Sequence, residues 1–214
     1  MSDNTFTLTK SILETASELY DAIDGTGIAD KAIRYALSQF PTNDDPVGVC
    51  IKAILVNTLY QTAIINISRM ASHIVEKNID SKLQASDVSV IDDIRSGHKI
   101  RTTKGNRKEI DFYSFATKYA HFHMPSSYPI YDNLVMRLVT EANRKMKFHE
   151  RFTQSQLLDY SIYKSVIDSL ARHLGIANWG YKKIDQGLWV CAKYRYQEGL
   201  PSGVTQRLKH VISA

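Results

Sequence analysis

A long apolar run is the feature that most constrains the fold of this chain. The sequence GVCIKAILVNTLYQTAIINISRMASHIV occupies residues 48–75, and Pro46 precedes it at a position suited to the first turn of a helix. Because the run is too apolar for a surface helix, it predicts one central buried helix or two helices that meet near residues 57–62. A chain of 214 residues with 43% apolar side chains can bury one substantial core around it.

Helical spacing of apolar residues continues through most of the sequence. Two stripes separated by a DGTG turn predict a helical hairpin, with Ile12, Ala16, Leu19, Tyr20 and Ile23 in the first and Ile28, Ala32, Tyr35, Ala36 and Phe40 in the second. Further helices are predicted at 87–96, 111–122, 132–147, 154–174, 182–197 and 203–212. Strand-like alternation is confined to short pieces such as HKIRTT, so the sequence predicts an all-α fold.

The composition favours an anionic partner inside the cell. A formal net charge of +5 and a pI near 9.1 favour nucleic acid, although proteins that bind nothing acidic also carry such a charge. Cys50 and Cys191 each lie within an apolar run, which predicts buried thiols and no disulfide or metal site. No stretch approaches the roughly 18 apolar residues of a membrane span, and the N-terminus lacks an apolar signal segment. We therefore expect a cytoplasmic protein.

The densest basic stretch is SGHKIRTTKGNRKEI, at residues 96–110. A loop that contains a glycine, here Gly105, can approach a phosphate backbone closely, and its cations release counterions on binding. The alternative is a solvated surface hairpin, and the sequence does not separate the two. The candidate nucleic-acid-binding residues are Lys99, Arg101, Lys104, Arg107 and Lys108.

The next segment, DFYSFATKYAHFHMP, places a lysine among hydroxyl, aromatic and imidazole groups. On a helix, Ser114, Thr117, Lys118 and His121 share one side. If that side is buried, Lys118 is a candidate nucleophile, whereas on an ordinary amphipathic helix it extends to solvent. His121 and His123 point in different directions on a helix, so no metal site is expected.

The stretch SSYPIYDNLV leads from a loop into another helix. Pro125 ends the preceding helix, and Asp132 stands directly before the next apolar stripe. An aspartate there can cap the helix, which is worth roughly 0.5–2 kcal/mol. The same ionised carboxylate could act as a base or stabilise a developing cation, and both roles stay open.

These residues resemble a known family. SSYPIYDNLVMRLV is similar to the segment of helix-hairpin-helix DNA glycosylases in which a proline, an aliphatic residue and the essential aspartate lead into a helix. FATKYAHFHMP resembles the lysine-bearing part before that aspartate, and NTLYQT resembles the end of an early helix that borders the DNA. The family's glycine-rich hairpin is lacking, because DFYSFATK stands in its place. The YPIYD motif is closer to uncharacterised bacterial proteins that are distant relatives of the glycosylases.

The resemblance implies a two-lobed helical domain with a central cleft. It implies one domain over residues 1–214, with one lobe from about 1–44 plus 140–214 and the other from 45–139. It also implies cleavage of the N-glycosidic bond of a modified base, with Asp132 stabilising the cationic sugar and Lys118 attacking the sugar or positioning a phosphate. The implied substrate-binding residues are Tyr60, Gln61, Tyr131, His121 and Trp189. No cofactor or metal is implied.

A second hypothesis assigns the chain no catalysis. The same helical frame would then be a nucleic-acid- or protein-binding module of a bacterial or phage-defence type system, with Asp132 as a helix cap only. Trp189 likewise has two interpretations, because it could stack on an extruded base or pack in the core.

Overall fold

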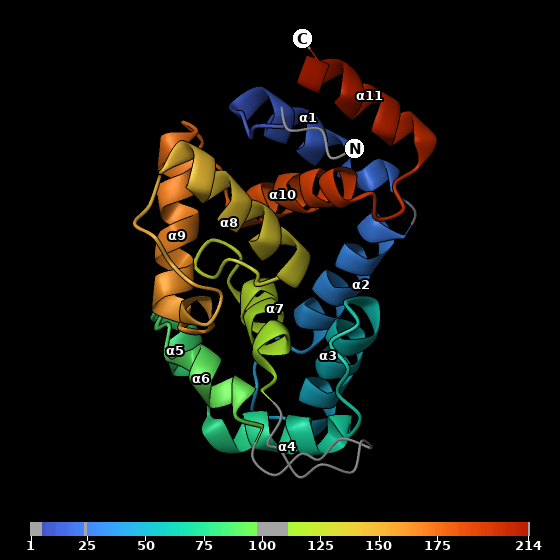
Figure 1. Cartoon of the computed structure of the whole chain (residues 1–214). Coiled ribbons are helices and arrows are strands. Elements are labelled where there is room, and N and C mark those ends of the chain that lie inside the picture. Colours follow the sequence, from blue (N-terminus) through green and yellow to red (C-terminus); the bar gives the residue numbers. More distant parts are fainter. Residues whose placement is uncertain (1–5, 24, 98–110, 214) are drawn as a thin grey trace. The chain divides into compact units, whose positions relative to one another are not determined.

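The described part of the chain is entirely helical. The computed structural model describes residues 6–23, 25–97 and 111–213 (Figure 1), and no β-strand occurs in these ranges. The prediction of an all-α fold is therefore confirmed for them. No helix within these ranges is long and apolar enough to cross a membrane.

The helices form two compact units. Unit 1 combines both ends of the chain, residues 1–27 and 131–214, and unit 2 comprises residues 28–130. The predicted lobes also joined the two ends of the chain, but with boundaries near residues 44 and 139. A single domain with a cleft between the lobes stays a prediction.

Unit 1 is built around α10. Its helix α10 contacts both α1 and α8, and α11 packs on α1 (Figure 1). The N-terminal segment and the C-terminal helices thereby share one core. The elements are α1 (Lys10–Leu19), η1 (Tyr20–Ala22), α8 (Asn133–Met146), η2 (Gln156–Leu158), α9 (Tyr160–His173), α10 (Tyr181–Tyr196) and α11 (Ser202–Ser213).

A glycine sets the distance between α1 and α10. A Cβ atom at Gly187 would lie 2.8 Å from the carbonyl oxygen of Leu13. Real side chains do not tolerate that approach to backbone, so only glycine lets the two helices pack this closely. The close contact buries Leu13 completely.

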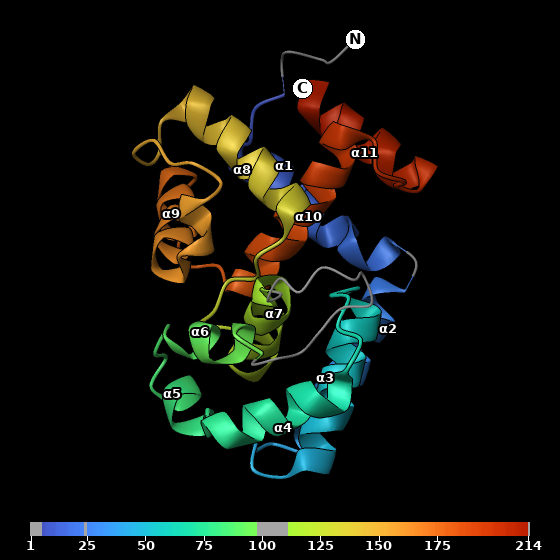
Figure 2. The ribbon, with the colours of Figure 1, turned by 60° about the horizontal axis from the view of Figure 1, so that its bottom comes forward.

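Unit 2 is arranged around α4 and α7. Figure 2 shows α4 running across the unit, where it contacts α3 and α6, and α7 packs against α3 and α6. The elements are α2 (Thr26–Gln39, which begins just before the unit boundary), α3 (Pro46–Leu59), α4 (Ile67–Lys77), α5 (Asp80–Gln84), α6 (Val90–Arg95) and α7 (Tyr113–His123).

The long apolar run forms two helices, as one of the two predictions had it. Helix α3 ends at Leu59 and α4 begins at Ile67. The Asn57 side chain organises the turn between them, because its Oδ1 accepts from the backbone N–H of Ile64 at 2.8 Å and from the Thr62 hydroxyl at 2.9 Å. Polar side chains thus end the run where the sequence predicted a junction.

The first predicted stripe is confirmed and the second is partly wrong. All five residues of the first stripe are buried, although α1 ends at Leu19, so that Tyr20 lies in η1 and Ile23 follows it. In α2, however, Ile28 and Tyr35 are 75% and 69% exposed, whereas Ile33 and Ala36 are buried. The helix exists, but its buried side is centred one residue position away from the side that the stripe indicated. Buried Asp30 also lies on that side.

Two smaller predictions also need correction. The segment 154–174 is not one helix, because α9 begins only at Tyr160, where Asp159 caps it after the short η2 turn. Cys191 is buried as predicted, but Cys50 is only half-buried. Its position near the start of α3 leaves its side chain at the edge of the core.

Candidate functional site

Asp132 is the N-cap of α8, and one of its two carboxylate oxygens does the capping. Its Oδ1 accepts from the backbone N–H of Leu134 at 2.8 Å and from that of Val135 at 3.2 Å. No described residue donates a hydrogen bond to its Oδ2. The side chain is half-buried. The helix therefore fixes the carboxylate and leaves one oxygen for another group.

The loop that precedes Asp132 is anchored in unit 2 by Tyr128. This side chain is completely buried, and its hydroxyl donates to the carbonyl oxygens of Lys82 and Asp87, both at 3.2 Å. Burial raises the pKa of Tyr128 to about 12, so the hydroxyl stays protonated. The Tyr128 carbonyl in turn accepts from Nδ1 of His121 at 2.7 Å, which fixes the tautomer of that imidazole.

Lys118 is buried, and the interpretation that it extends to solvent is wrong. The side chain is 4% exposed, and its Nζ donates to the Ser114 hydroxyl at 2.7 Å. Thr117 and His121, which the sequence placed on the same side, are buried as well. Helix α7 packs on almost every side, so its polar stripe faces the interior and satisfies its hydrogen bonds there.

Tyr60 and His121 both lie close to the aromatic ring of Phe122 on α7. The rings of Tyr60 and Phe122 meet edge to face with centroids 5.4 Å apart, and the His121 ring is 5.7 Å from that of Phe122. The Tyr60 hydroxyl donates to Oδ1 of Asp30. Gln61, the next residue, is exposed and has left-handed backbone geometry with φ at 50°. Two predicted substrate-binding residues of unit 2 therefore share one neighbourhood.

Tyr131 and Trp189 belong to unit 1. Tyr131 is 8% exposed and packs edge to face on Tyr163, with ring centroids 5.5 Å apart. Trp189 is half-buried, and its ring contacts Tyr20 at 5.6 Å. The Lys193 ammonium lies 4.8 Å from the Trp189 ring centroid. Trp189 thus packs partly in the core and keeps part of its surface accessible.

The predicted site residues divide between the two units. Unit 2 holds Tyr60, Gln61, Lys118 and His121, and unit 1 holds Tyr131, Asp132 and Trp189. A common site for Lys118 and Asp132 stays a prediction. The basic residues at positions 99–108 lie outside the described residues, so their role also stays a prediction.

Sequence reasoning missed a buried polar network in unit 2. Lys52 is 1% exposed, and its Nζ donates to the Thr42 carbonyl at 2.6 Å and to the Asn43 side-chain oxygen at 2.9 Å. The Tyr119 hydroxyl donates to the same oxygen at 2.6 Å. The Asn43 backbone N–H and side-chain amide both donate to the carboxylate of Asp80, at 2.8 and 2.5 Å. The available signal was a single lysine inside the most apolar run of the chain.

Burial changes the protonation behaviour of this network. It lowers the pKa of Lys52 to about 8 and raises the pKa of Tyr119 well above its usual range. His123 lies beside Tyr119, with ring centroids 5.0 Å apart, and burial lowers its pKa to about 3. The side chains of Asn43, Lys52 and Tyr119 are buried, although Thr42 is exposed and Asp80 is half-buried. We therefore interpret the network as the structural centre of unit 2 and not as a binding site.

Comparison with known proteins gives the chain a family. Residues 10–127, more than half of the chain, match the model of HI_0787_N, described as an N-terminal domain. The chain belongs to the HI_0787_N family. A protein of Haemophilus influenzae that is described as uncharacterized is 33% identical over 138 residues, which cover 64% of this chain and 62% of the relative. No solved structure matches the chain.

The HI_0787_N match divides the candidate residues. It runs from the start of α1 to the loop after α7, so it includes Tyr60, Lys118 and the network around Lys52. Asp132 and Trp189 lie beyond it. The chain spans only 62% of the length of the Haemophilus relative.

Proposed function

We propose that this protein acts on a modified base in nucleic acid and assists hydrolysis of the N-glycosidic bond with Asp132. The observation that carries the proposal is the geometry of this carboxylate. Two backbone N–H groups hold its Oδ1, and its Oδ2 has no hydrogen-bond donor among the described residues. A fixed negative charge of this kind can stabilise a cationic sugar without reorganising during the reaction. We also propose a cytoplasmic location.

The proposed step needs only water as a co-reactant. The bond between the base and the sugar carbon breaks, and its electron pair leaves with the base. Asp132 stabilises the positive charge that develops on the sugar. A water oxygen then bonds to that carbon and loses a proton, and the departing base takes up one proton, so the products are the free base and the sugar hydroxyl. Lys118 would attack the sugar carbon in place of water or hold a phosphate, as the resemblance implies. Either role requires its amine, which is buried and donates to Ser114, to become accessible to the substrate.

The second candidate is a non-catalytic module that binds nucleic acid or protein. It is favoured by one observation, which is that capping alone explains an aspartate at the start of α8. The two candidates differ in what removing the charge of Asp132 does, because a cap can be kept while the charge is lost.

Base release from a panel of oligonucleotides tests the proposal. The panel contains modified and damaged bases in single-stranded and duplex DNA and in RNA, and free base is measured after incubation with the parent protein and with Asp132→Asn. Since Asn is also a good N-cap, the variant should unfold within about 1 kcal/mol of the parent yet lose base release. If the parent releases no base from any panel member, and Asp132→Ala only lowers the melting temperature, Asp132 is a cap and the second candidate holds.

A further inference from the structure

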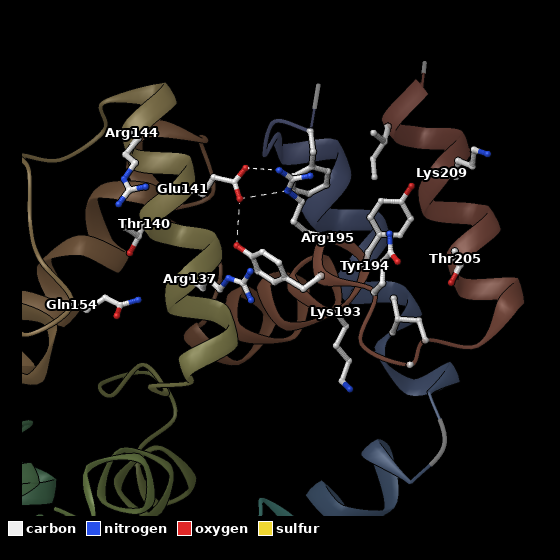
Figure 3. Close-up of a pocket in the computed structure, with 16 residues that line it drawn as sticks. Arg137, Thr140, Glu141, Arg144, Gln154, Lys193, Tyr194, Arg195, Thr205 and Lys209 are labelled. Carbon is white, nitrogen blue, oxygen red and sulfur yellow. Dashed lines mark hydrogen bonds and ion pairs between the residues drawn. The ribbon is translucent and has the colours of Figure 1, made fainter. Parts of the chain in front are cut away.

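Unit 1 contains a groove with a strongly basic lining. Figure 3 shows α8 on one side of it, with the end of α10 and helix α11 on the other. Its volume is about 1110 Å³. Among the described residues, five cationic side chains and one carboxylate, that of Glu141, line the groove. The cations come from three helices and are Arg137, Arg144, Lys193, Arg195 and Lys209.

Glu141 neutralises only one of these cations. Its Oε1 accepts from Nη2 of Arg195 at 2.7 Å, and its Oε2 accepts from the Tyr196 hydroxyl at 3.3 Å. The hydrogen bond from Arg195 lowers the pKa of Glu141, so the carboxylate is ionised and fully engaged. Lys145, which does not line the groove, also pairs with it at 3.6 Å. The other four groove cations are left without a lining carboxylate.

The side of α8 that faces the groove carries side chains that can bind an anion. The Arg137 guanidinium lies 4.0 Å from the Tyr196 ring centroid, which fixes its plane while its N–H groups can still donate. Arg144, two turns further along α8, forms no ion pair with a described residue. Between them, the buried Thr140 hydroxyl has no hydrogen-bond partner within the described part of the chain.

The opposite wall adds two more cations. Lys209 on α11 is exposed and unpaired among the described residues, and Lys193 on α10 donates to the Glu198 carbonyl at 3.0 Å. Figure 3 shows Arg144 and Lys209 at the two outer edges of the groove, with their charged ends directed away from each other, and Lys193 below them. One small anion could contact only part of this set, whereas a chain of phosphates could contact several members at once.

We infer that this groove, whose lining includes neither Asp132 nor any residue of the basic segment 99–108, binds the sugar–phosphate backbone of a nucleic-acid strand. The choice of nucleic acid as the polyanion rests on the proposed function. Helix α8 connects the groove to the Asp132 carboxylate. Asp132 caps the helix, and Arg137 follows five residues later, about 8 Å along the axis at 1.5 Å per residue. A strand bound at Arg137 is thus held by the same rigid helix that positions the carboxylate.

Fluorescence anisotropy with a labelled, unmodified oligonucleotide tests the groove directly. Binding is measured over a salt series for the parent, for Arg144→Gln/Lys209→Gln, and for the control Arg172→Gln/Arg207→Gln. The control removes the same charge from exposed positions on α9 and α11 that do not line the groove. The groove variant should reduce the slope of log K against log salt by roughly 1.4 for a single strand, at about 0.7 per lost contact, and the control should keep the parental slope.

An unchanged slope in the groove variant would overturn the inference, and so would either of two further results. One is an equal change of slope in both double variants, which would indicate diffuse attraction by net charge. The other is protection against thermal unfolding by inorganic phosphate or a mononucleotide with no oligonucleotide binding, which would make the groove a small-anion site. Base release is scored separately, so an unchanged slope with intact base release rejects the groove alone. Normal groove binding without base release rejects the proposed function alone.

Discussion

Two cationic side chains in unit 2 and two in unit 1 have opposite environments. In unit 2, Lys52 and Lys118 are almost completely buried and donate to neighbouring oxygens. In unit 1, Arg144 and Lys209 are exposed along a groove and pair with no described residue. Buried charges must be satisfied internally and therefore determine stability, whereas exposed charges cost little and remain available to a ligand. The comparison predicts that a substitution in the buried polar network destabilises unit 2, whereas replacing an exposed cation of the groove weakens the binding of an anionic ligand to unit 1.

The largest expected effect is the loss of the amide at the centre of the unit 2 network. Asn43→Leu leaves buried Lys52 and the Tyr119 hydroxyl without their shared acceptor, and should cost about 3–5 kcal/mol of unfolding free energy. The matched variant in unit 1 is Asn143→Leu, at a buried asparagine whose side chain, among the described residues, bonds to the backbone of His149 and Glu150. It should cost about 1–3 kcal/mol in the same denaturant titration. Equal losses of unfolding free energy in the two variants would contradict the claim that the buried network contributes more to the stability of unit 2 than Asn143 contributes to that of unit 1.

A smaller effect is expected from the pH dependence of Lys52. Its pKa is about 8 in the folded protein and 10.5 ordinarily, so between these values the unfolded chain binds more protons and stability rises with pH. Relative to Lys52→Met, the parent should gain roughly 1.5 kcal/mol between about pH 8 and 9.5, because the full slope of about 1.36 kcal/mol per pH unit is reached only above the folded pKa. Unfolding of both proteins by urea across this range measures the difference. A difference that is constant with pH would mean that Lys52 titrates normally.

The smallest expected effect on stability comes from the groove cations. Arg144→Gln/Lys209→Gln removes two exposed, unpaired charges and should change the unfolding free energy by less than about 0.5 kcal/mol. Differential scanning calorimetry of the parent and the variant checks this. A clear destabilisation would show that these side chains support the packing of unit 1, and the binding loss could then not be assigned to lost phosphate contacts.

Local sequence patterns predicted the elements well. The length of the apolar run and its polar residues near Asn57 indicated a junction there, and Pro125 and Asp132 marked the end of α7 and the start of α8. These features act over a few residues, through capping and through the missing N–H of proline. They are visible in one sequence without knowledge of the tertiary structure.

Tertiary environment was the part that the sequence did not reveal. The pattern around Lys118 fits an amphipathic helix, and only the packing of α7 on its neighbours shows that the amine is buried. In α2, Ile28 has the spacing of a core residue but is exposed. The groove cations come from three helices that are distant in sequence, so no spacing rule joins them.

The most direct test of the central claim compares two aspartate caps in unit 1. Asp159 caps α9 as Asp132 caps α8, with one oxygen accepting from Ser161 at 2.9 Å and from Ile162 at 3.3 Å. The single-turnover rate of base release is measured for Asp132→Asn and Asp159→Asn on the best substrate of the panel. We predict that Asp132→Asn lowers the rate by at least about 100-fold and that Asp159→Asn leaves it unchanged. Equal rates in the two variants would contradict a chemical role for Asp132.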